Sequence, residues 1–371
     1  MELPTGKQMF IFGAGKFGAF WLETLRHKYN IAGFIDNDKT KKEYKGLPVY
    51  SDELKSEDSI ILLAFYHKST ADEVINQLTK EYNFKLNENM FWLTPFLKDI
   101  DDEEFLKLFY TVCFEKELRL NPPITYNEKL QWLKLYDRNP KYTILADKHK
   151  VRAKVDSKYL IPLLGTYENA HDIDFEALPE QFVLKCNHDS DSVVICKSIY
   201  VNKYGKVLPN EDAVKTKLNA AISQNWYYLA REWAYKNIKP LIMAEEYIGD
   251  DIQEYRFYVF NGKVKLIHVD FDTATFRKAN MYTPDWDYIP CSWTYPTDPN
   301  KKIKKPDLFN KMVEIAETLS KGLLHLRVDL FLAGNKIYFG ETGFYHSGGF
   351  AQIKPYEYDE LFGSWLDLTK E

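Results

Sequence analysis

The sequence predicts an α/β protein, and three observations lead to this fold class. Near the amino terminus, an apolar strand runs into a glycine-rich turn and then a helical pattern over residues 9–27. Near the carboxyl terminus, apolar segments at 254–269 and 326–341 are each interrupted by turn residues, which is typical of antiparallel hairpins. An acidic, helical stretch that ends in Asn-Pro-Pro at 121–123 separates the two regions. We therefore expect a parallel sheet followed by an α+β part.

These elements indicate three parts in a chain of 371 residues. Residues 1–97 hold half of a Rossmann-type parallel sheet, with further strands expected at 31–35 and 59–64. Residues 98–120 form a helical linker, because its acids favour the first turn of a helix. Residues 121–371 form the larger α+β domain.

Composition argues against several classes of function. The net charge is −5, so a general binder of nucleic-acid backbones is not expected. The four cysteines lack CxxC spacing and the eight histidines lack zinc-ligand spacing, so we expect reduced thiols and a cytoplasmic protein. The clearest apolar run, 60–65, is too short to cross a bilayer, and the first residues lack a signal-peptide core.

The glycine-rich turn has the GxGxxG spacing of a nucleotide-binding loop. Gly13, Gly15 and Gly18 lie between the first strand and its helix, and Asp36 follows the second strand. Glycines let backbone N–H groups approach phosphate at a helix N-terminus, and the acid can bind ribose hydroxyls. The unit resembles the small Rossmann-like domain of bacterial sugar acetyltransferases, which contacts a nucleotide-sugar. These four residues are candidate nucleotide contacts; in the alternative interpretation, the glycines serve only close helix–strand packing.

Two acids mark the hairpin at 326–341. Asp329 interrupts its first strand and Glu341 ends its second. Paired strands can bring such carboxylates together to hold Mg²⁺ against nucleotide phosphates, because Mg²⁺ prefers oxygen ligands. In the alternative interpretation, the two acids only cap a hairpin. The surrounding sequence has to distinguish between these two interpretations.

Several segments of the larger domain resemble a known family. They are, in order, 125–138, 146–152, 181–188, 231–233, 244–248, 327–330 and 340–341. Their order and spacing resemble the TupA-like (teichuronopeptide-type) ATP-grasp ligases of surface-polysaccharide biosynthesis, over residues 119–371. The resemblance implies an ATP-grasp fold, in which two α+β subdomains enclose a nucleotide cleft.

The resemblance also implies roles for particular residues. Lys148 and Lys185 match the two lysines that bind ATP phosphates, as point charges from separate segments. Glu245, Glu246 and Ile248 match the hinge strand that holds adenine and ribose.

Further matches concern catalysis and the metal. Arg256 and Arg277 match basic positions near the substrate and phosphates, and together with Lys185 they are the expected catalytic residues. Asp329 and Glu341 match the Mg²⁺ ligands, so ATP and Mg²⁺ are the expected cofactors.

Two places depart from the family pattern. In the loop 188–192, Asp189 and Asp191 replace glycines, and their carboxylates would repel a triphosphate unless they point away or face metal. Gly343 stands two positions after the last metal ligand, where ATP-grasp enzymes commonly carry Asn or a hydroxyl residue. Either Thr342 or water could take over that role.

The resemblance implies an ATP-dependent carboxylate–amine ligase that forms an amide through an acyl phosphate, by positioning and charge stabilisation. Its implied partners are a small-molecule carboxylate, such as a uronic acid or nucleotide-sugar, and an amine, in bacterial capsule or cell-wall synthesis. Two alternatives stay open. One is a kinase of the same fold that phosphorylates a sugar or amide, and the other is a catalytically weak sugar-nucleotide-binding scaffold.

Overall fold

The chain folds into two compact units, Met1–Leu118 and Arg119–Glu371. The structure is a computed structural model that describes residues 2–51, 58–271 and 276–369. Among these described residues, no helix is long and apolar enough to cross a membrane.

The first unit contains a six-stranded sheet with the strand order β3-β4-β2-β1-β5-β6. Its strands are β1 (Gln8–Phe12), β2 (Ile31–Ile35), β3 (Glu43–Tyr44), β4 (Leu47–Tyr50), β5 (Ser59–Leu63) and β6 (Met90–Trp92). All neighbours run parallel except the edge strand β3, which is antiparallel to β4. The strands predicted at 31–35 and 59–64 are thus confirmed, and both pair with β1.

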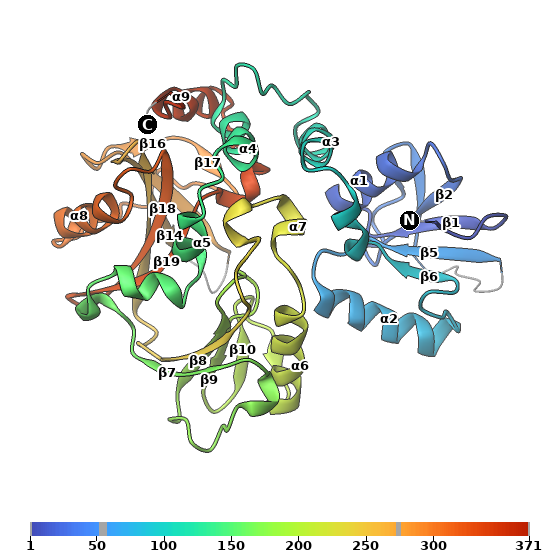
Figure 1. Cartoon of the computed structure of the whole chain (residues 1–371), viewed down its shortest axis with the longest axis horizontal. Helices are drawn as coiled ribbons and strands as arrows, with labels where there is room; N and C mark the ends of the chain where they lie inside the picture. Colours follow the sequence, from blue (N-terminus) through green and yellow to red (C-terminus); the bar gives the residue numbers. More distant parts are fainter. Residues whose placement is uncertain (1, 52–57, 272–275, 370–371) are drawn as a thin grey trace. The chain divides into compact units, whose positions relative to one another are not determined.

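Helices cover both faces of this sheet. They are α1 (Lys16–Leu25), α2 (Lys68–Tyr82), the short 3-10 helix η1 (Thr94–Asp99) and α3 (Asp102–Phe114). Figure 1 shows α1 and α3 on one side of the sheet and α2 on the other. The ring of Phe20 in α1 lies 5.0 Å from that of Phe105 and 5.7 Å from that of Phe109, both in α3. Helix α3 therefore belongs to the core of the first unit, whereas the sequence placed it in a linker.

The second unit contains two six-stranded sheets. The first, in the order β11-β10-β9-β8-β12-β7, consists of β7 (Leu163–Tyr167), β8 (Phe182–Cys186), β9 (Val194–Cys196), β10 (Tyr200–Asn202), β11 (Val207–Leu208) and β12 (Ile242–Glu246). The second, in the order β16-β15-β14-β13-β18-β19, consists of β13 (Ile252–Phe260), β14 (Lys263–Phe271), β15 (Lys278–Tyr282), β16 (Tyr288–Ile289), β18 (His325–Ala333) and β19 (Lys336–Gly343). A small third sheet pairs β17 (Ser292–Trp293) with β20 (Ile353–Lys354).

Each large sheet packs against helices and has its own core. The α-helices are α4 (Tyr126–Tyr136), α5 (Lys141–Ala146), α6 (Glu211–Ile222), α7 (Tyr227–Ala230), α8 (Phe309–Leu319) and α9 (Glu357–Trp365). The 3-10 helices are η2 (Lys150–Lys154), η3 (Ser157–Tyr159), η4 (Ala170–Asp172), η5 (Trp233–Tyr235) and η6 (His346–Gly349). Figure 1 shows α6 beside the first of these sheets and α8 beside the second.

Alternation along β18 separates core residues from site residues. Leu326, Val328 and Leu330 are fully buried and belong to the core that includes helix α8. Because successive side chains of a strand point to opposite faces, Arg327 and Asp329 face away from this core. A shift of one residue would place both charged groups in the core, so the apolar face fixes the register.

The two predicted hairpins are confirmed. Strands β13 and β14 are joined at Asn261 and Gly262, whose φ angles of 47° and 79° suit a two-residue hairpin turn. Strands β18 and β19 are antiparallel neighbours, and Asp329 lies opposite Glu341.

Candidate functional site

A row of ionisable residues crosses the second sheet. Glu341 on β19, Asp329 on β18, Arg256 on β13 and His268 on β14 are successive cross-strand partners. Glu341, Asp329 and Arg256 line a cavity of about 470 Å³. Residues of both six-stranded sheets of the second unit enclose this cavity. Lys148 and Lys185 line the same cavity. The four residues expected to bind phosphate and metal therefore meet in one place.

The two predicted phosphate lysines are paired with acids. Nζ of Lys148 lies 3.1 Å from Glu341, and its side chain is 7 % exposed. Nζ of Lys185 lies 2.5 Å from one oxygen of Glu245, and Arg152 lies 3.1 Å from the other oxygen. Strand β8 buries Phe182, Leu184 and Cys186, so alternation directs Lys185 to the cavity.

Arg327 is a site residue that the sequence analysis did not assign. Its guanidinium donates to both oxygens of Asp329, at 2.7 Å each, and to Glu341 at 2.8 Å. A cationic group thus lies between the two predicted metal ligands. The sequence did contain a signal for Arg327. It lies two residues before Asp329 on the same strand, so the two side chains point to the same face of the sheet.

Burial and neighbouring charges set the protonation of the two acids. Burial alone would raise the pKa of Glu341, but Lys148 and Arg327 outweigh it and hold that pKa at about 2. Burial raises the pKa of Asp329 to about 7, and the charge of Glu341 adds to this rise against the pull of Arg327. Glu341 therefore holds its negative charge more firmly than Asp329 does.

The donor set fits Mg²⁺ held together with nucleotide phosphates. Asp329 and Glu341 supply two carboxylates that already surround a positive charge, and Mg²⁺ is commonly held by one or two carboxylates plus phosphate oxygens and water. Within the described part of the chain, no group of three or more His, Cys, Asp or Glu residues could hold a metal. Phosphate oxygens and water would supply further ligands.

The loop 188–192 keeps its two carboxylates bonded to protein groups. Asp189 accepts a hydrogen bond of 2.5 Å from the hydroxyl of Ser192. Asp191 lies 3.6 Å from the ammonium groups of both Lys203 and Lys217. From this loop, Ser190 lines the cavity. Because the two carboxylates are already bonded to or paired with protein groups, they would repel a bound triphosphate less than the sequence led us to expect.

Thr342 does not replace the side chain that is missing at Gly343. The hydroxyl of Thr342 donates to the carbonyl oxygen of Leu145 at 2.5 Å, and the residue is buried. A Cβ atom at Gly343 would lie 3.5 Å from the guanidinium of Arg327. The arginine therefore borders the position where other ATP-grasp enzymes commonly carry a polar side chain.

The predicted hinge lines the cavity. Glu245, Glu246 and Ile248 all contribute to its wall. Glu245 is buried by its pairing with Lys185, whereas Glu246 is exposed. The N–H of Glu246 donates to the carbonyl oxygen of Pro162 at 3.0 Å. Adenine and ribose binding at this strand stays a prediction.

The two predicted catalytic arginines, Arg256 and Arg277, pair with the same acidic residues. Arg256 lies 2.9 Å from Glu254 and 2.8 Å from Asp270. Arg277 pairs with Asp270, and its guanidinium lies 4.6 Å from the centre of the Tyr295 ring. Both arginines, Glu254 and Tyr295 line the cavity. One end of the cavity therefore combines positive charge with an aromatic face.

The segment after β19 forms another wall of the cavity, through His346 and Ser347. The ring of His346 lies 2.8 Å from the hydroxyl of Tyr258 and 3.1 Å from that of Thr294. Burial lowers the pKa of His346 well below its usual range, so the ring is neutral. His346 could not be identified as a site residue from the sequence, because only the fold brings Tyr258 and Thr294 to it.

In the first unit, the residues of the GxGxxG turn meet Asp36 at one edge of the sheet. The N–H of Gly13 donates to the carbonyl oxygen of Ile35, and that of Ala14 donates to Asp36 at 2.9 Å. A Cβ at Gly18 would lie 1.9 Å from the carbonyl oxygen of Gly13, so only glycine permits this close packing. Gly15 has free space around it. These contacts give Gly18 and Asp36 structural roles, and nucleotide binding by the four residues stays a prediction.

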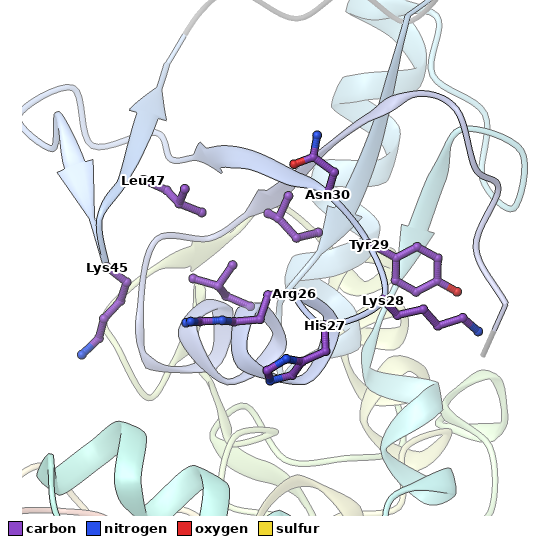
Figure 2. Close-up of a pocket in the computed structure, with 9 residues that line it drawn as sticks. Arg26, His27, Lys28, Tyr29, Asn30, Lys45 and Leu47 are labelled. Atoms are coloured by element: carbon purple, nitrogen blue, oxygen red, sulfur yellow. The ribbon is translucent and has the colours of Figure 1, made fainter.

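A second hollow of about 590 Å³ lies in the first unit and does not include these residues. It is lined by Leu22, Arg26, His27, Lys28, Tyr29, Asn30, Ile31, Lys45 and Leu47. Figure 2 shows Arg26 and Lys28 pointing in opposite directions. Arg26 pairs with Glu23 and Lys45 with Glu115. The basic groups therefore do not converge on one point.

Solved structures to which the chain is similar, each at low sequence identity, include a synthetase and two ligases. N5-carboxyaminoimidazole synthetase from Staphylococcus aureus with ADP is 13 % identical over 92 % of this chain and 71 % of its own, with a TM-score of 0.31. D-alanine–D-alanine ligase from Bacillus anthracis with ATP is 14 % identical over 91 % and 86 %, with a TM-score of 0.32. L-amino acid ligase from Bacillus licheniformis is 15 % identical over 94 % and 70 %, with a TM-score of 0.34. No protein with a curated description matches the chain.

The family assignment rests on sequence instead. The family model described as TupA-like ATPgrasp matches residues 128–367. This match spans well over half of the chain, and it contains both predicted phosphate lysines and both predicted metal ligands. The chain therefore belongs to the TupA-like ATP-grasp family, which confirms the fold and the ligase class predicted from its sequence.

Proposed function

We propose that the protein is a carboxylate–amine ligase that joins a sugar acid to an amine during the synthesis of a surface polysaccharide. As an ATP-grasp ligase it uses ATP and Mg²⁺. The main support for the site is the cavity in which Lys148, Lys185, Asp329 and Glu341 come together. The sugar acid and the polysaccharide are proposed from the resemblance of the sequence to the family.

The residues of the cavity suggest a division of roles. Lys148 and Lys185 would bind phosphate oxygens, and Asp329 and Glu341 would hold Mg²⁺. When bound, the metal supplies positive charge that offsets the charge on the phosphates. Arg256 and the partly exposed Arg277 would orient the substrate carboxylate, because a guanidinium can bind a carboxylate through two hydrogen bonds.

The proposed reaction has two steps. A carboxylate oxygen of the substrate attacks the γ-phosphorus of ATP, the bond to the bridging oxygen of ADP breaks, and an acyl phosphate forms. The nitrogen of the amine then attacks the carbonyl carbon, which releases phosphate and a proton and leaves an amide. The protein contributes positioning and charge stabilisation, so it needs no nucleophile of its own.

The first prediction tests this assignment. Lys185→Ala and Glu341→Ala should each lower ADP formation by about 100-fold or more, because the first removes a positive charge that faces the phosphates and the second removes a proposed ligand of Mg²⁺. Lys158→Ala, a change at a lysine that is 61 % exposed, should leave the rate unchanged. ADP release is measured with candidate acids and amines, and circular dichroism checks the fold.

Two results would count against the proposal. Wild-type rates in both variants would overturn the site assignment. Formation of a phosphorylated acceptor without free phosphate would favour a kinase over a ligase.

A further inference from the structure

A third lysine lines the cavity together with Lys148 and Lys185. Lys203 lies in the turn that joins β10 to β11, at the edge of the first six-stranded sheet of the second unit. Its side chain is 29 % exposed. The three lysines come from separate segments. The fold brings them together, and their spacing in the sequence does not predict it.

Lys148 and Lys203 hold adjacent residues of one loop. Nζ of Lys148 donates to the carbonyl oxygen of Asp189, and Nζ of Lys203 donates to that of Ser190. Ser190 itself lines the cavity. Two ammonium groups thus reach neighbouring acceptors in the cavity wall. Phosphate oxygens are stronger acceptors for an ammonium than backbone carbonyls, because they are charged.

The acid beside Lys203 has a second cationic partner. Asp191 lies 3.6 Å from Nζ of Lys203 and 3.6 Å from Nζ of Lys217. If Lys203 binds a ligand, Lys217 still balances the charge of Asp191. Burial lowers the pKa of Lys203, and the charges of Asp191, Asp189 and Glu341 oppose this lowering. Lys203 and Glu341 line the same cavity.

We propose that Lys203 is a third phosphate-binding cation, which contacts the terminal phosphates of ATP. This inference rests on the proposed function, because it assigns Lys203 to the same nucleotide site. A lysine ammonium is a compact charge on a flexible stem, so it can exchange the carbonyl of Ser190 for a phosphate oxygen. Loss of this contact must weaken ATP binding more than ADP binding and leave AMP binding unchanged.

The second prediction concerns the affinities of the full chain for ATP, ADP and AMP with Mg²⁺, measured by isothermal titration calorimetry. Lys203→Gln removes the charge but keeps a donor for the carbonyl of Ser190, and Lys203→Arg keeps the charge. Lys206→Ala, in the same turn but outside the cavity lining, is the matched control. We expect Lys203→Gln to weaken ATP binding at least about tenfold and ADP binding less. Lys203→Arg and Lys206→Ala should bind ATP nearly as wild type does.

Each alternative result has a distinct meaning. Equal weakening of all three nucleotides by Lys203→Gln would show that Lys203 only shapes the loop, and unchanged ATP affinity would show that it does not contact phosphate; either overturns the inference. A folded wild-type protein that binds none of the nucleotides would overturn the proposed function, and this inference with it. Urea midpoints verify that each variant is folded.

Discussion

At the scale of single residues, Arg327 explains how two acids can face each other in a buried place. Asp329 and Glu341 lie on adjacent strands, and their like charges would repel each other. The guanidinium of Arg327 lies between them and bonds to both. A planar group with several donors can satisfy two carboxylates at once, which a lysine ammonium does less well.

The third prediction removes this group. Arg327→Ala should lower the free energy of unfolding by about 3–5 kcal/mol, because it removes the guanidinium that bonds to both oxygens of the buried Asp329. Mg²⁺ alone should then raise Tm more in the variant than in the wild type, since the metal can take the place of the lost charge. Differential scanning fluorimetry with and without Mg²⁺ measures both effects.

A double variant provides the control for this experiment. Arg327→Ala combined with Asp329→Asn should lose the additional Mg²⁺ effect, because only one carboxylate remains. If Mg²⁺ stabilises Arg327→Ala no more than it stabilises the wild type, these acids do not form the metal site.

At the scale of elements, His325 connects the start of β18 to two other segments. Its Nδ1–H donates to the carbonyl oxygen of Phe344 at 2.9 Å, and its Nε2 lies 2.8 Å from the hydroxyl of Tyr126 in α4. Burial lowers the pKa of His325 from 6.5 to about 4. The neutral ring therefore helps to fasten the strand that carries Arg327 and Asp329.

The fourth prediction follows from this pKa. Above pH 6.5 the ring is neutral in both the folded and the unfolded state, so its contribution to stability is fully present. As the pH falls from 6.5 to about 4, the unfolded state binds the proton more readily, and stability of up to roughly 3 kcal/mol is lost. His325→Gln should unfold in urea with a shallower dependence on pH in this range. An identical pH dependence in both proteins would contradict the prediction.

The elements also show what the sequence could and could not predict. Leu326, Val328 and Leu330 alternate with charged residues, so the hairpin and its two acids could be read from local pattern. Lys203 could not be found in this way, because its partner Ser190 lies in another strand connection and only the sheet brings them together. The partners of Asp191 escaped prediction for the same reason.

At the scale of the whole molecule, the chain has two units with separate cores. Lys148, Lys185, Asp329 and Glu341 belong to the second unit, Arg119–Glu371, whereas the GxGxxG turn, a separate candidate for nucleotide binding, belongs to the first. The sequence placed the junction close to this boundary but could not assign α3. That assignment depends on contacts of Phe105 and Phe109 with a helix far back in the chain.

The fifth prediction separates the units. Residues 119–371 expressed alone should bind Mg·ATP with an affinity within about threefold of that of the full chain, because Lys148, Lys185, Asp329 and Glu341, the residues proposed to bind the phosphates and Mg²⁺, lie within them. Calorimetry on both proteins makes the comparison, and urea unfolding verifies that the shorter chain is folded. A folded second unit without affinity for Mg·ATP would mean that residues of the first unit complete the site.

The mixture of charges in the cavity has a practical consequence for the design of inhibitors. Among the residues that the structure describes, its wall carries six basic side chains and five acidic ones, namely Lys148, Lys185, Lys203, Arg256, Arg277, Arg327, Glu245, Glu246, Glu254, Asp329 and Glu341. A purely anionic compound would gain from the lysines but would also be repelled by carboxylates that are held in fixed places. Selective compounds for this cleft should therefore be zwitterionic, with an amidine or amine directed at the exposed Glu246 and an acidic group directed at the lysines.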